Sequence, residues 1–198
     1  MPRRPDPAQQ ERRRDAIVEA AATLFAEKGY EATTAADIGR AAGLSGPSVF
    51  YYFEDKATVF RALFERDVPR LRAVLERESA GDDPVDALLT IVRDLAADVN
   101  DPIAPGLVAE LVRRAPHDPA LAQVVMDADA RTQRVLTALV ERAVDVGRAR
   151  PGLPAAVVAR WIQIVVDGVA LHGGESSDDP WPALRTLVLR FLRAEEKP

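Results

Sequence analysis

AAGLSGPSVFYYFEDK, residues 41–56, carries four successive aromatic side chains, Phe50 to Phe53. The whole chain of 198 residues contains only two Trp, three Tyr and six Phe. Gly43, Leu44 and Ser45 form a tight linker in front of this run. The pattern predicts a short helix that begins at Ser45 and follows another short helix after a sharp turn.

The second of these short helices is expected to have a buried side and an exposed side. At about 100° per residue, Val49, Phe50 and Phe53 cluster on one arc. Because a helix this short is not held by its own hydrogen bonds, we expect these apolar side chains to anchor it against the rest of the domain. The opposite arc carries smaller or hydroxyl-bearing residues, namely Pro47, Ser48 and Tyr51, with Tyr52 at its edge.

The helix before the linker carries its own start and stop signals. Thr34 is predicted to begin it, with Asp37 completing a capping box, and Gly43 to end it. Two short helices with an outward polar face are typical of a helix-turn-helix, whose second helix meets base edges in DNA. Lys56, at the start of the next helix, would attract phosphate together with the positive helix end. The alternative is a short aromatic helix that only fills a core.

The rest of the chain has a helical pattern, with proline and glycine at the joints. A first helix contains Ile17 and Phe25 and ends at Gly29. A longer helix starts near Asp55, and Pro69 inside it predicts a kink or a restart. No strand alternation or hairpin signal is found, so the fold class is all-α. Later helices are expected at roughly 85–99, 103–115, 118–146, 154–172 and 181–194.

Composition excludes several classes of protein. The chain has no cysteine, so disulfides and cysteine metal sites are impossible, and a cytoplasmic location is expected. The polar N-terminus does not resemble a secretory signal. The best candidate for a membrane span, residues 153–173, is interrupted by Arg160, Gln163 and Asp167, so no membrane association is expected. A formal charge of −5 does not by itself indicate nucleic-acid binding. The arginines of residues 1–14 are interpreted as a solvated arm, and the alternative is an arm that touches phosphate.

Residues 12–64, RRRDAIVEAAATLFAEKGYEATTAADIGRAAGLSGPSVFYYFEDKATVFRALF, closely resemble the DNA-binding domain of TetR-type transcriptional regulators. Three motifs occur in the family's order: AAxxLFxEKGYxxTT, DIxxAAGLS and YYFxDK. The resemblance implies an all-helical homodimer of about nine helices, with an N-terminal three-helix helix-turn-helix domain and a C-terminal helical bundle. The implied domains are a flexible arm at 1–10, a DNA-binding domain at 11–57 (helix-turn-helix about 34–53) and a ligand-binding and dimerisation domain at 58–198.

The resemblance also implies a function and a set of DNA-binding residues. The expected function is repression of transcription from a near-palindromic double-stranded operator, with release by an unknown small-molecule effector. Thr34 would cap the helix that crosses the DNA backbone and, with Thr33, lie near phosphate. The residues expected to enter the major groove are Ser45, Gly46, Pro47, Ser48 and Tyr51, while Tyr52 and Lys56 would hold phosphates.

Several positions depart from the family pattern. Phe50 replaces a tyrosine that many relatives have, so a hydroxyl contact made there is lost. Gly39 replaces a frequent alanine, at a cost of about 1 kcal/mol in helix propensity. Ala35 and Gly46 offer no polar side chain to a base. We therefore expect methyl and van der Waals contacts from Pro47, Ser48 and Tyr51, together with DNA shape, to carry much of the sequence specificity.

The C-terminal two thirds of the chain has a weaker resemblance to the BetI-like subgroup. Its last two expected helices are apolar over a broad arc and so need two partners. The alternatives are a buried intrachain hairpin and a two-fold dimer interface, which the resemblance favours. The dimer residues expected on this basis are Val158, Trp161, Ile162, Val165, Val169, Leu184, Leu187, Val188 and Phe191. Arg160, Gln163 and Asp167 share a polar stripe that is interpreted as solvated or as interface contacts.

Other functions remain open at the level of sequence. No effector-binding residue is assigned, although Asp94, Asp98, Glu110, Arg113 and Arg114 are polar candidates that are also ordinary surface charges. No cofactor or metal is expected, because the sequence has no HExxH, GxGxxG or Walker-type motif. A helical enzyme and a DNA-independent dimeric module that binds small molecules are the rival interpretations.

Overall fold

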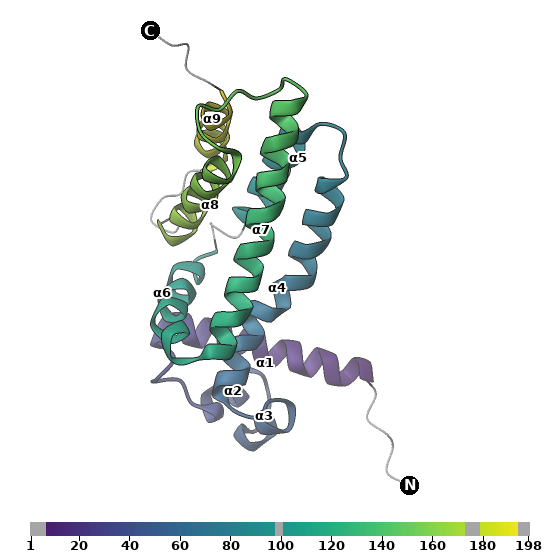
Figure 1. Ribbon diagram of the computed structural model, residues 1–198. Coiled ribbons are helices and arrows are strands. Elements are labelled where there is room, and N and C mark those ends of the chain that lie inside the picture. The colour runs from purple at the N-terminus through teal and green to yellow at the C-terminus, as the bar shows by residue number, and fades with distance from the viewer. Residues whose placement is uncertain (1–6, 98–100, 173–178, 194–198) are drawn as a thin grey trace. The chain divides into compact units, whose positions relative to one another are not determined.

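The computed structural model describes residues 7–97, 101–172 and 179–193, and in these residues all regular structure is helical (Figure 1). This confirms the all-α fold class. The chain divides into two compact units, which are described separately below. The first unit comprises residues 1–67 and 106–124, and the second comprises residues 68–105 and 125–198. The sequence-based boundary between residues 57 and 58 differs from this division, because residues 106–124, which include most of the helix at 104–114, belong to the first unit.

The first unit contains the N-terminal helices and parts of three longer ones. Its complete helices are α1 (Pro7–Lys28), α2 (Ala35–Ala41) and α3 (Gly46–Tyr52). It also contains the start of α4 (Lys56–Ser79), most of α6 (Ala104–Arg114), the short 3₁₀ helix η2 (Ala115–His117) and the first residues of α7 (Pro119–Asp145). Gly29 and Gly43 follow α1 and α2 with φ of 81° and 69°, a backbone conformation that favours glycine.

Aromatic rings form the centre of the first unit. Phe25 of α1 stacks on Tyr30 with 5.3 Å between the ring centroids. The Phe60 ring of α4 meets both of them edge-on, at 5.2 Å from Phe25 and 5.5 Å from Tyr30. Phe25 and Phe60 are almost completely buried. Because aromatic pairs add to the free energy of burial, this cluster fixes the end of α1 against the start of α4.

The two short helices pack unusually closely, and two glycines permit it. A Cβ atom added to Gly39 of α2 would lie 2.8 Å from the backbone carbon and oxygen of Ser45. A Cβ atom on Gly46 would lie 3.1 Å from the Cα atom of Ala36. Gly39 is therefore not only the weak helix former that the sequence indicates, because its missing side chain makes room for the start of α3.

Helix α6 packs directly on α1 within the first unit. A Cβ atom on Gly106 would lie 2.6 Å from the carbonyl oxygen of Ala26. On the same side, the Arg61 guanidinium of α4 lies 3.9 Å from the carboxylate of Asp118, which also caps α7 by accepting a hydrogen bond from the Leu121 amide. The first unit is thus assembled from residues that are far apart in the sequence.

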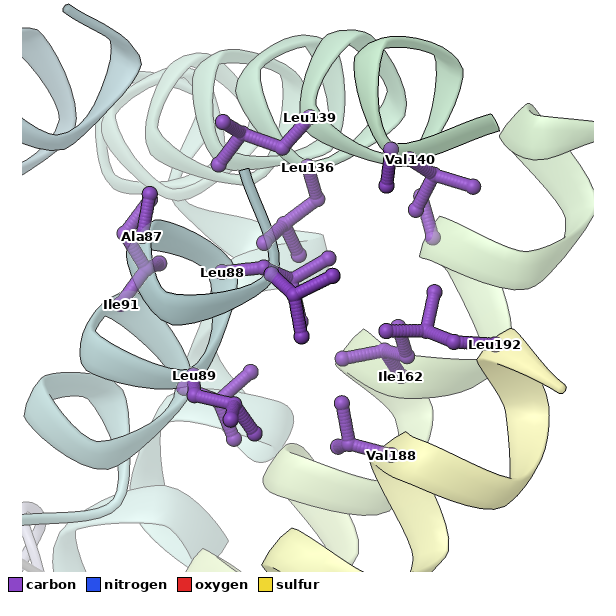
Figure 2. Close-up of a cluster of buried hydrophobic side chains, with 14 of the residues drawn as sticks. Ala87, Leu88, Leu89, Ile91, Leu136, Leu139, Val140, Ile162, Val188 and Leu192 are labelled. Carbon is purple, nitrogen blue, oxygen red and sulfur yellow. The ribbon is translucent and has the colours of Figure 1, made fainter. Parts of the chain in front are cut away.

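The second unit is a helical bundle around one aliphatic core. It contains α5 (Pro84–Leu95), α8 (Ala155–His172) and α9 (Trp181–Leu192) with the remaining parts of α4 and α7. Figure 2 shows side chains of α5, α7, α8 and α9 converging on this core. Leu88, Leu136 and Ile162 have no exposed surface there. The buried faces of these helices explain their apolar periodicity in the sequence.

The observed helices begin and end within a few residues of the expected positions, with two differences. Pro7 to Gln10, expected in the flexible arm, form the first turns of α1; residues 1–6 of the expected arm lie outside the described residues. Pro69 lies inside α4, which continues from Lys56 to Ser79 without a restart. The boundary between the two units falls within α4, α6 and α7, so each chain connection between the units runs through a helix.

Candidate DNA-binding site

Helix α3 is anchored by two apolar side chains and exposes the rest. Val49 and Phe53 are 1% and 2% exposed, whereas Tyr51 is 69% exposed. Phe50, expected in the core, is 53% exposed, so that expectation is wrong. The reason is that α3 ends at Tyr52 and the backbone of Phe53 is extended (φ −138°, ψ 136°). This turn brings Phe53 into the core beside Val49 and leaves Phe50 on the outer surface.

The start of α3 presents small side chains. Ser45 is the N-terminal cap residue, but its hydroxyl makes no hydrogen bond to the α3 backbone. The Oγ atoms of Ser45 and Ser48 instead lie 2.6 Å apart. Ser45 and Pro47 are exposed, and Gly46 is half-buried against α2. The expected major-groove residues therefore lie together on an accessible surface.

Two arginines of α1 support the end of α3. The Arg13 guanidinium donates a hydrogen bond of 3.5 Å to the Tyr52 hydroxyl, and the Arg14 guanidinium lies 4.3 Å from the centroid of the Phe53 ring. The Tyr51 and Tyr52 rings meet edge-on at 5.1 Å. A hollow of about 370 Å³ lies between the two helices and is lined by Gln9, Gln10 and Arg13 of α1 and by Ser48, Tyr51 and Tyr52 of α3.

Sequence reasoning missed the contribution of α1 to this surface. The basic residues before residue 15 were interpreted as a solvated arm, with an arm that touches phosphate as the alternative, and neither Arg13 nor Arg14 was assigned to the DNA surface. The contacts of Arg13 with Tyr52 and of Arg14 with Phe53 become visible only in the tertiary structure, because these residues are about 39 positions apart in the sequence. The result is a hollow with hydrogen-bond donors on both sides.

Helix α2 begins with the capping box that the sequence predicts. The Thr34 hydroxyl accepts a hydrogen bond from the Asp37 amide, and the Asp37 carboxylate accepts one from the Thr34 amide at 3.1 Å. The Thr34 hydroxyl also donates a hydrogen bond of 2.7 Å to the Asp37 carboxylate, and this bond, together with the one from the Thr34 amide, lowers the pKa of the Asp37 carboxyl below its usual value. Thr34 is exposed, as a phosphate contact requires.

Thr33 is unsuited to the DNA contact expected of it. The side chain is completely buried, and its hydroxyl donates hydrogen bonds to the carbonyl oxygens of Gly29 at 2.8 Å and of Leu24 at 3.2 Å. Leu24 lies near the end of α1, and Gly29 directly follows the helix. Thr33 therefore closes the end of α1 and is left out of the DNA surface.

The half-buried Lys56 side chain also bonds to the protein's own backbone. Its Nζ atom donates hydrogen bonds to the carbonyl oxygens of Tyr30 at 2.7 Å and of Thr33 at 2.9 Å. The same atom lies 4.3 Å from the centroid of the Tyr30 ring. The expected phosphate contact of Lys56 is therefore corrected, because a charge held by backbone carbonyls is not free to bind DNA.

Comparisons with known proteins agree with this arrangement of helices. The family model for bacterial regulatory proteins of the tetR family matches residues 17–63, and the model for the C-terminal domain of BetI-type transcriptional repressors matches residues 84–195. The second match covers more than half of the chain. The chain belongs to the TetR family. The BetI-like resemblance of the C-terminal part is thereby confirmed as well.

Individual relatives support the same conclusion. The HTH-type transcriptional repressor Rv1474c of Mycobacterium tuberculosis is 31% identical over 170 residues, which are 85% of each chain. The HTH-type transcriptional repressor AcnR of Corynebacterium diphtheriae is 30% identical over 164 residues, covering 79% of this chain and 78% of the relative. This TetR-family chain is a DNA-binding transcriptional regulator, and its relatives are regulators and not enzymes.

A solved structure shows the same fold. The crystal structure of a TetR transcription regulator from Haloarcula marismortui superposes with a TM-score of 0.76 at 20% sequence identity, and covers 92% of this chain and 97% of that chain. At this identity the likeness concerns the fold alone. Within the described residues, no helix is long and apolar enough to cross a membrane, and no group of three or more His, Asp or Glu side chains is arranged to hold a metal ion.

The expected dimer residues of this TetR-family regulator fall into two groups. Val158, Ile162, Leu184 and Val188 are at most 2% exposed and belong to the core of their own chain, so for these four the expectation is wrong. Trp161 and Leu187 are 48% and 42% exposed. Val165, Val169 and Phe191 are half-buried. The apolar residues on the inner side of α8 and α9 are thus buried within the chain, as the alternative of an intrachain hairpin predicts. Other apolar residues of the two helices remain exposed on the outer side.

The outer side of α8 has a regular apolar stripe. Its large members are 38–48% exposed and, with Gly168, follow one another at intervals of four and three residues. A Cβ atom on Gly168 would meet no atom within 4 Å. Alternating intervals of four and three are the spacing with which two helices pack along one seam. The α8 stripe comprises Val157, Trp161, Ile164, Gly168 and Leu171.

Polar side chains flank the α8 stripe. Gln163 is 7% exposed and donates a hydrogen bond of 2.7 Å to the Asp129 carboxylate of α7. The Arg160 guanidinium lies 3.5 Å from the other oxygen of Asp129. Asp167 keeps an accessible surface, but partial burial raises the pKa of its carboxyl, and the negative charge of Asp129 adds to the rise. Gln163 and Arg160 of the polar stripe are therefore held by Asp129, so the stripe is not fully solvated.

The polar candidates for effector binding that the structure describes make contacts within their own unit. Glu110 is 6% exposed and pairs with Arg113. The Arg114 guanidinium lies 3.6 Å from the centroid of the Tyr30 ring, on which Lys56 also packs. Burial raises the pKa of the Tyr30 hydroxyl. Asp94 lies 3.6 Å from the Arg70 guanidinium, and Asp98 lies outside the described residues.

Proposed function

We propose that this TetR-family regulator is a repressor that binds a near-palindromic operator as a homodimer and is released by a small-molecule effector. The observation that carries the proposal is the exposed face of α3, which is held rigidly from behind by Val49 and Phe53. A helix in this setting can insert into a major groove without losing its own packing. The names of the relatives support repression as the direction of control. A chromosomal target would place the protein in the cytoplasm.

The proposed DNA contacts fall into two groups. The groove-facing group is small and lies at the start and on the outer face of α3, comprising Ser45, Gly46, Pro47, Ser48 and Tyr51. Thr34, Tyr52 and Arg13 form the phosphate-facing group, because their polar atoms lie on either side of this helix. Phosphate contacts of this kind fix the register of the protein on the duplex, and groove contacts select the sequence.

The proposed dimer forms through the outer side of α8 and α9. Leu187 of α9 is 42% exposed, close in value to the residues of the α8 stripe. A second copy related by two-fold symmetry would cover the α8 stripe and Leu187 with its own α8 stripe and Leu187. The small Gly168 in the middle would allow the two helices to approach closely. Such a dimer would place two recognition helices about 34 Å apart, one turn of DNA.

Release by an effector requires a ligand that prefers a conformation unable to bind both half-sites, because equal affinity for two conformations changes nothing. The three connections between the units all run inside helices, namely α4, α6 and α7. A displacement of any of these helices by a bound effector would therefore reach the first unit without passing through a flexible linker. This continuity supports the effector-controlled mechanism.

The test is selection of binding sites from sheared DNA of the source organism, followed by measurement of affinity and stoichiometry on the recovered duplex. We expect an inverted repeat to be enriched and to bind one dimer. A Tyr51→Ala, Tyr52→Ala variant should fold and dimerise but lose binding. Enrichment of no sequence would contradict the proposal and favour a dimeric module that acts without DNA. A direct sequence repeat bound by monomers would contradict the dimeric mode alone.

A further inference from the structure

The exposed face of α3 is chemically divided along its length. Pro47 and Phe50 are three residues apart and therefore neighbours on the helix surface, as are Ser48 and Tyr51. The first pair has no polar side-chain atom, and the second pair carries two hydroxyl groups. One half of the face is thus apolar and the other half can donate and accept hydrogen bonds. The Phe50 ring, 53% exposed, provides most of the apolar half.

An exposed phenyl ring at this position needs a partner of matching chemistry. Phe50 cannot hold a phosphate or read a base by hydrogen bonding, because its side chain has neither a donor nor an acceptor. In the major groove, the apolar group that base pairs present is the C5-methyl group of thymine, and 5-methylcytosine presents the same group. The hydroxyl half of the same short helix borders a hollow lined by Tyr52 and by Arg13, whose side chains offer hydrogen-bond donors suited to a duplex.

We propose that the apolar half of the α3 face, Phe50 with Pro47, binds the C5-methyl groups of pyrimidines in the operator. This inference rests on the proposed function, because it assumes that α3 enters the major groove. It assigns sequence selection to Phe50, a residue that was expected in the core and that is exposed. The hydroxyl half, Ser48 and Tyr51, remains free to make hydrogen bonds to other base edges. An operator read in this way contains thymine at a fixed position of each half-site.

The experiment removes single methyl groups from the DNA. In the duplex recovered by selection, each thymine is replaced in turn by deoxyuridine, which keeps every hydrogen bond and lacks only the methyl group. At one position or more in each half-site, we expect the dissociation constant of the wild-type protein to rise by about three- to fivefold, the effect of burying one methyl group. Fluorescence anisotropy at constant salt measures this change.

Protein variants then show which residue senses the methyl group. Phe50→Ala should bind the thymine and deoxyuridine duplexes equally at the sensitive position, whereas the matched variant Ser48→Ala should keep the full difference. As a check that needs no variant, a C·G pair at that position should bind the wild-type protein less well than a 5-methylcytosine·G pair. An undiminished difference in Phe50→Ala, or no sensitive thymine at all, overturns the inference. The proposed function itself fails only if no duplex is recovered.

Discussion

Lys56 is bonded to the backbone of Tyr30 and also packs on its ring: Nζ lies 2.7 Å from the Tyr30 carbonyl oxygen and 4.3 Å from the ring centroid. The Arg114 guanidinium also packs on this ring. Tyr30 is therefore held between a cation of α4 and a cation of α6, within one compact unit. The role of Lys56 in this regulator is to join the start of α4 to the segment between α1 and α2.

Replacement of Lys56 by methionine should reduce stability without removing a phosphate contact. The substitution deletes charge-assisted hydrogen bonds to two carbonyls, so the free energy of unfolding should fall by about 2–4 kcal/mol. Denaturant unfolding measures this loss. Lys28→Met, which changes the same charge at the exposed end of α1, should lose little. A slope of affinity against salt that drops in Lys56→Met at a temperature where it is folded would show that Lys56 binds phosphate after all.

Gly39→Ala distinguishes packing from helix propensity. Propensity alone predicts a gain of about 1 kcal/mol. The added Cβ atom would, however, lie 2.8 Å from the Ser45 backbone, and overpacking of this kind costs about 1–3 kcal/mol. We expect a net loss of stability and weaker operator binding, because α3 must shift. Gly152→Ala is the control, since a Cβ atom there has open space. A stabilised Gly39→Ala protein with unchanged affinity would refute the close packing of α2 and α3.

A charge placed in the α8 stripe should dissociate the proposed dimer. Trp161→Glu places two carboxylates in an interface that two-fold symmetry makes self-facing. We expect sedimentation to show a monomer that retains its helical circular dichroism, with operator affinity reduced by at least about tenfold because a monomer engages one half-site. Val112→Glu alters an apolar side chain of α6 that is 67% exposed and should leave the dimer intact. A dimeric Trp161→Glu protein would place the interface elsewhere.

Asp167→Asn should stabilise the protein at neutral pH. The folded-state pKa of Asp167 is raised above its ordinary value of 3.8, so the folded state binds the proton more tightly than the unfolded state. The wild-type protein therefore loses stability as pH rises from that value through the raised pKa, and the amide removes this loss. Unfolding by urea at about pH 4 and at neutral pH should show a gain for Asp167→Asn that grows with pH.

Two features make the Asp167 result specific. The charges around Asp167 are Asp129, which raises the pKa, and Arg160, which lowers it. Asp145→Asn, at the end of α7, provides a control in which a carboxylate is lost at an exposed position. An equal gain in both variants, or a gain for Asp167→Asn that is independent of pH, would show that partial burial of this carboxylate is not the cause.

Arg13→Ala should reduce the number of phosphates that the protein engages. If the guanidinium beside the Tyr52 hydroxyl meets one phosphate per subunit, the slope of log affinity against log salt should fall by about 0.9 for each phosphate lost. Arg72→Ala, a variant with the same change of charge on an exposed part of α4, should keep the slope. An unchanged slope in Arg13→Ala would mean that Arg13 only supports α3.

Local signals in the sequence located most of the helices. Gly29 and Gly43 adopt the positive φ that their places after α1 and α2 indicate, and Thr34 and Asp37 form the predicted capping box. Such signals work because a helix end must satisfy its backbone groups within a few residues. The prediction for α3 was correct for Val49 and wrong for Phe50, because the helical projection was continued through Phe53, where the backbone is already extended.

The positions of the helices, the helix-turn-helix and the family of this protein follow from the sequence alone, since they depend on short-range periodicity, caps and an ordered set of motifs. The packing of the folded chain sets which apolar side chains stay exposed, as with Trp161 and Phe50, and which polar side chains bond to the protein's own backbone, as with Thr33 and Lys56. The physical reason is that burial depends on what packs against each face of a helix. That neighbour comes from a distant part of the chain.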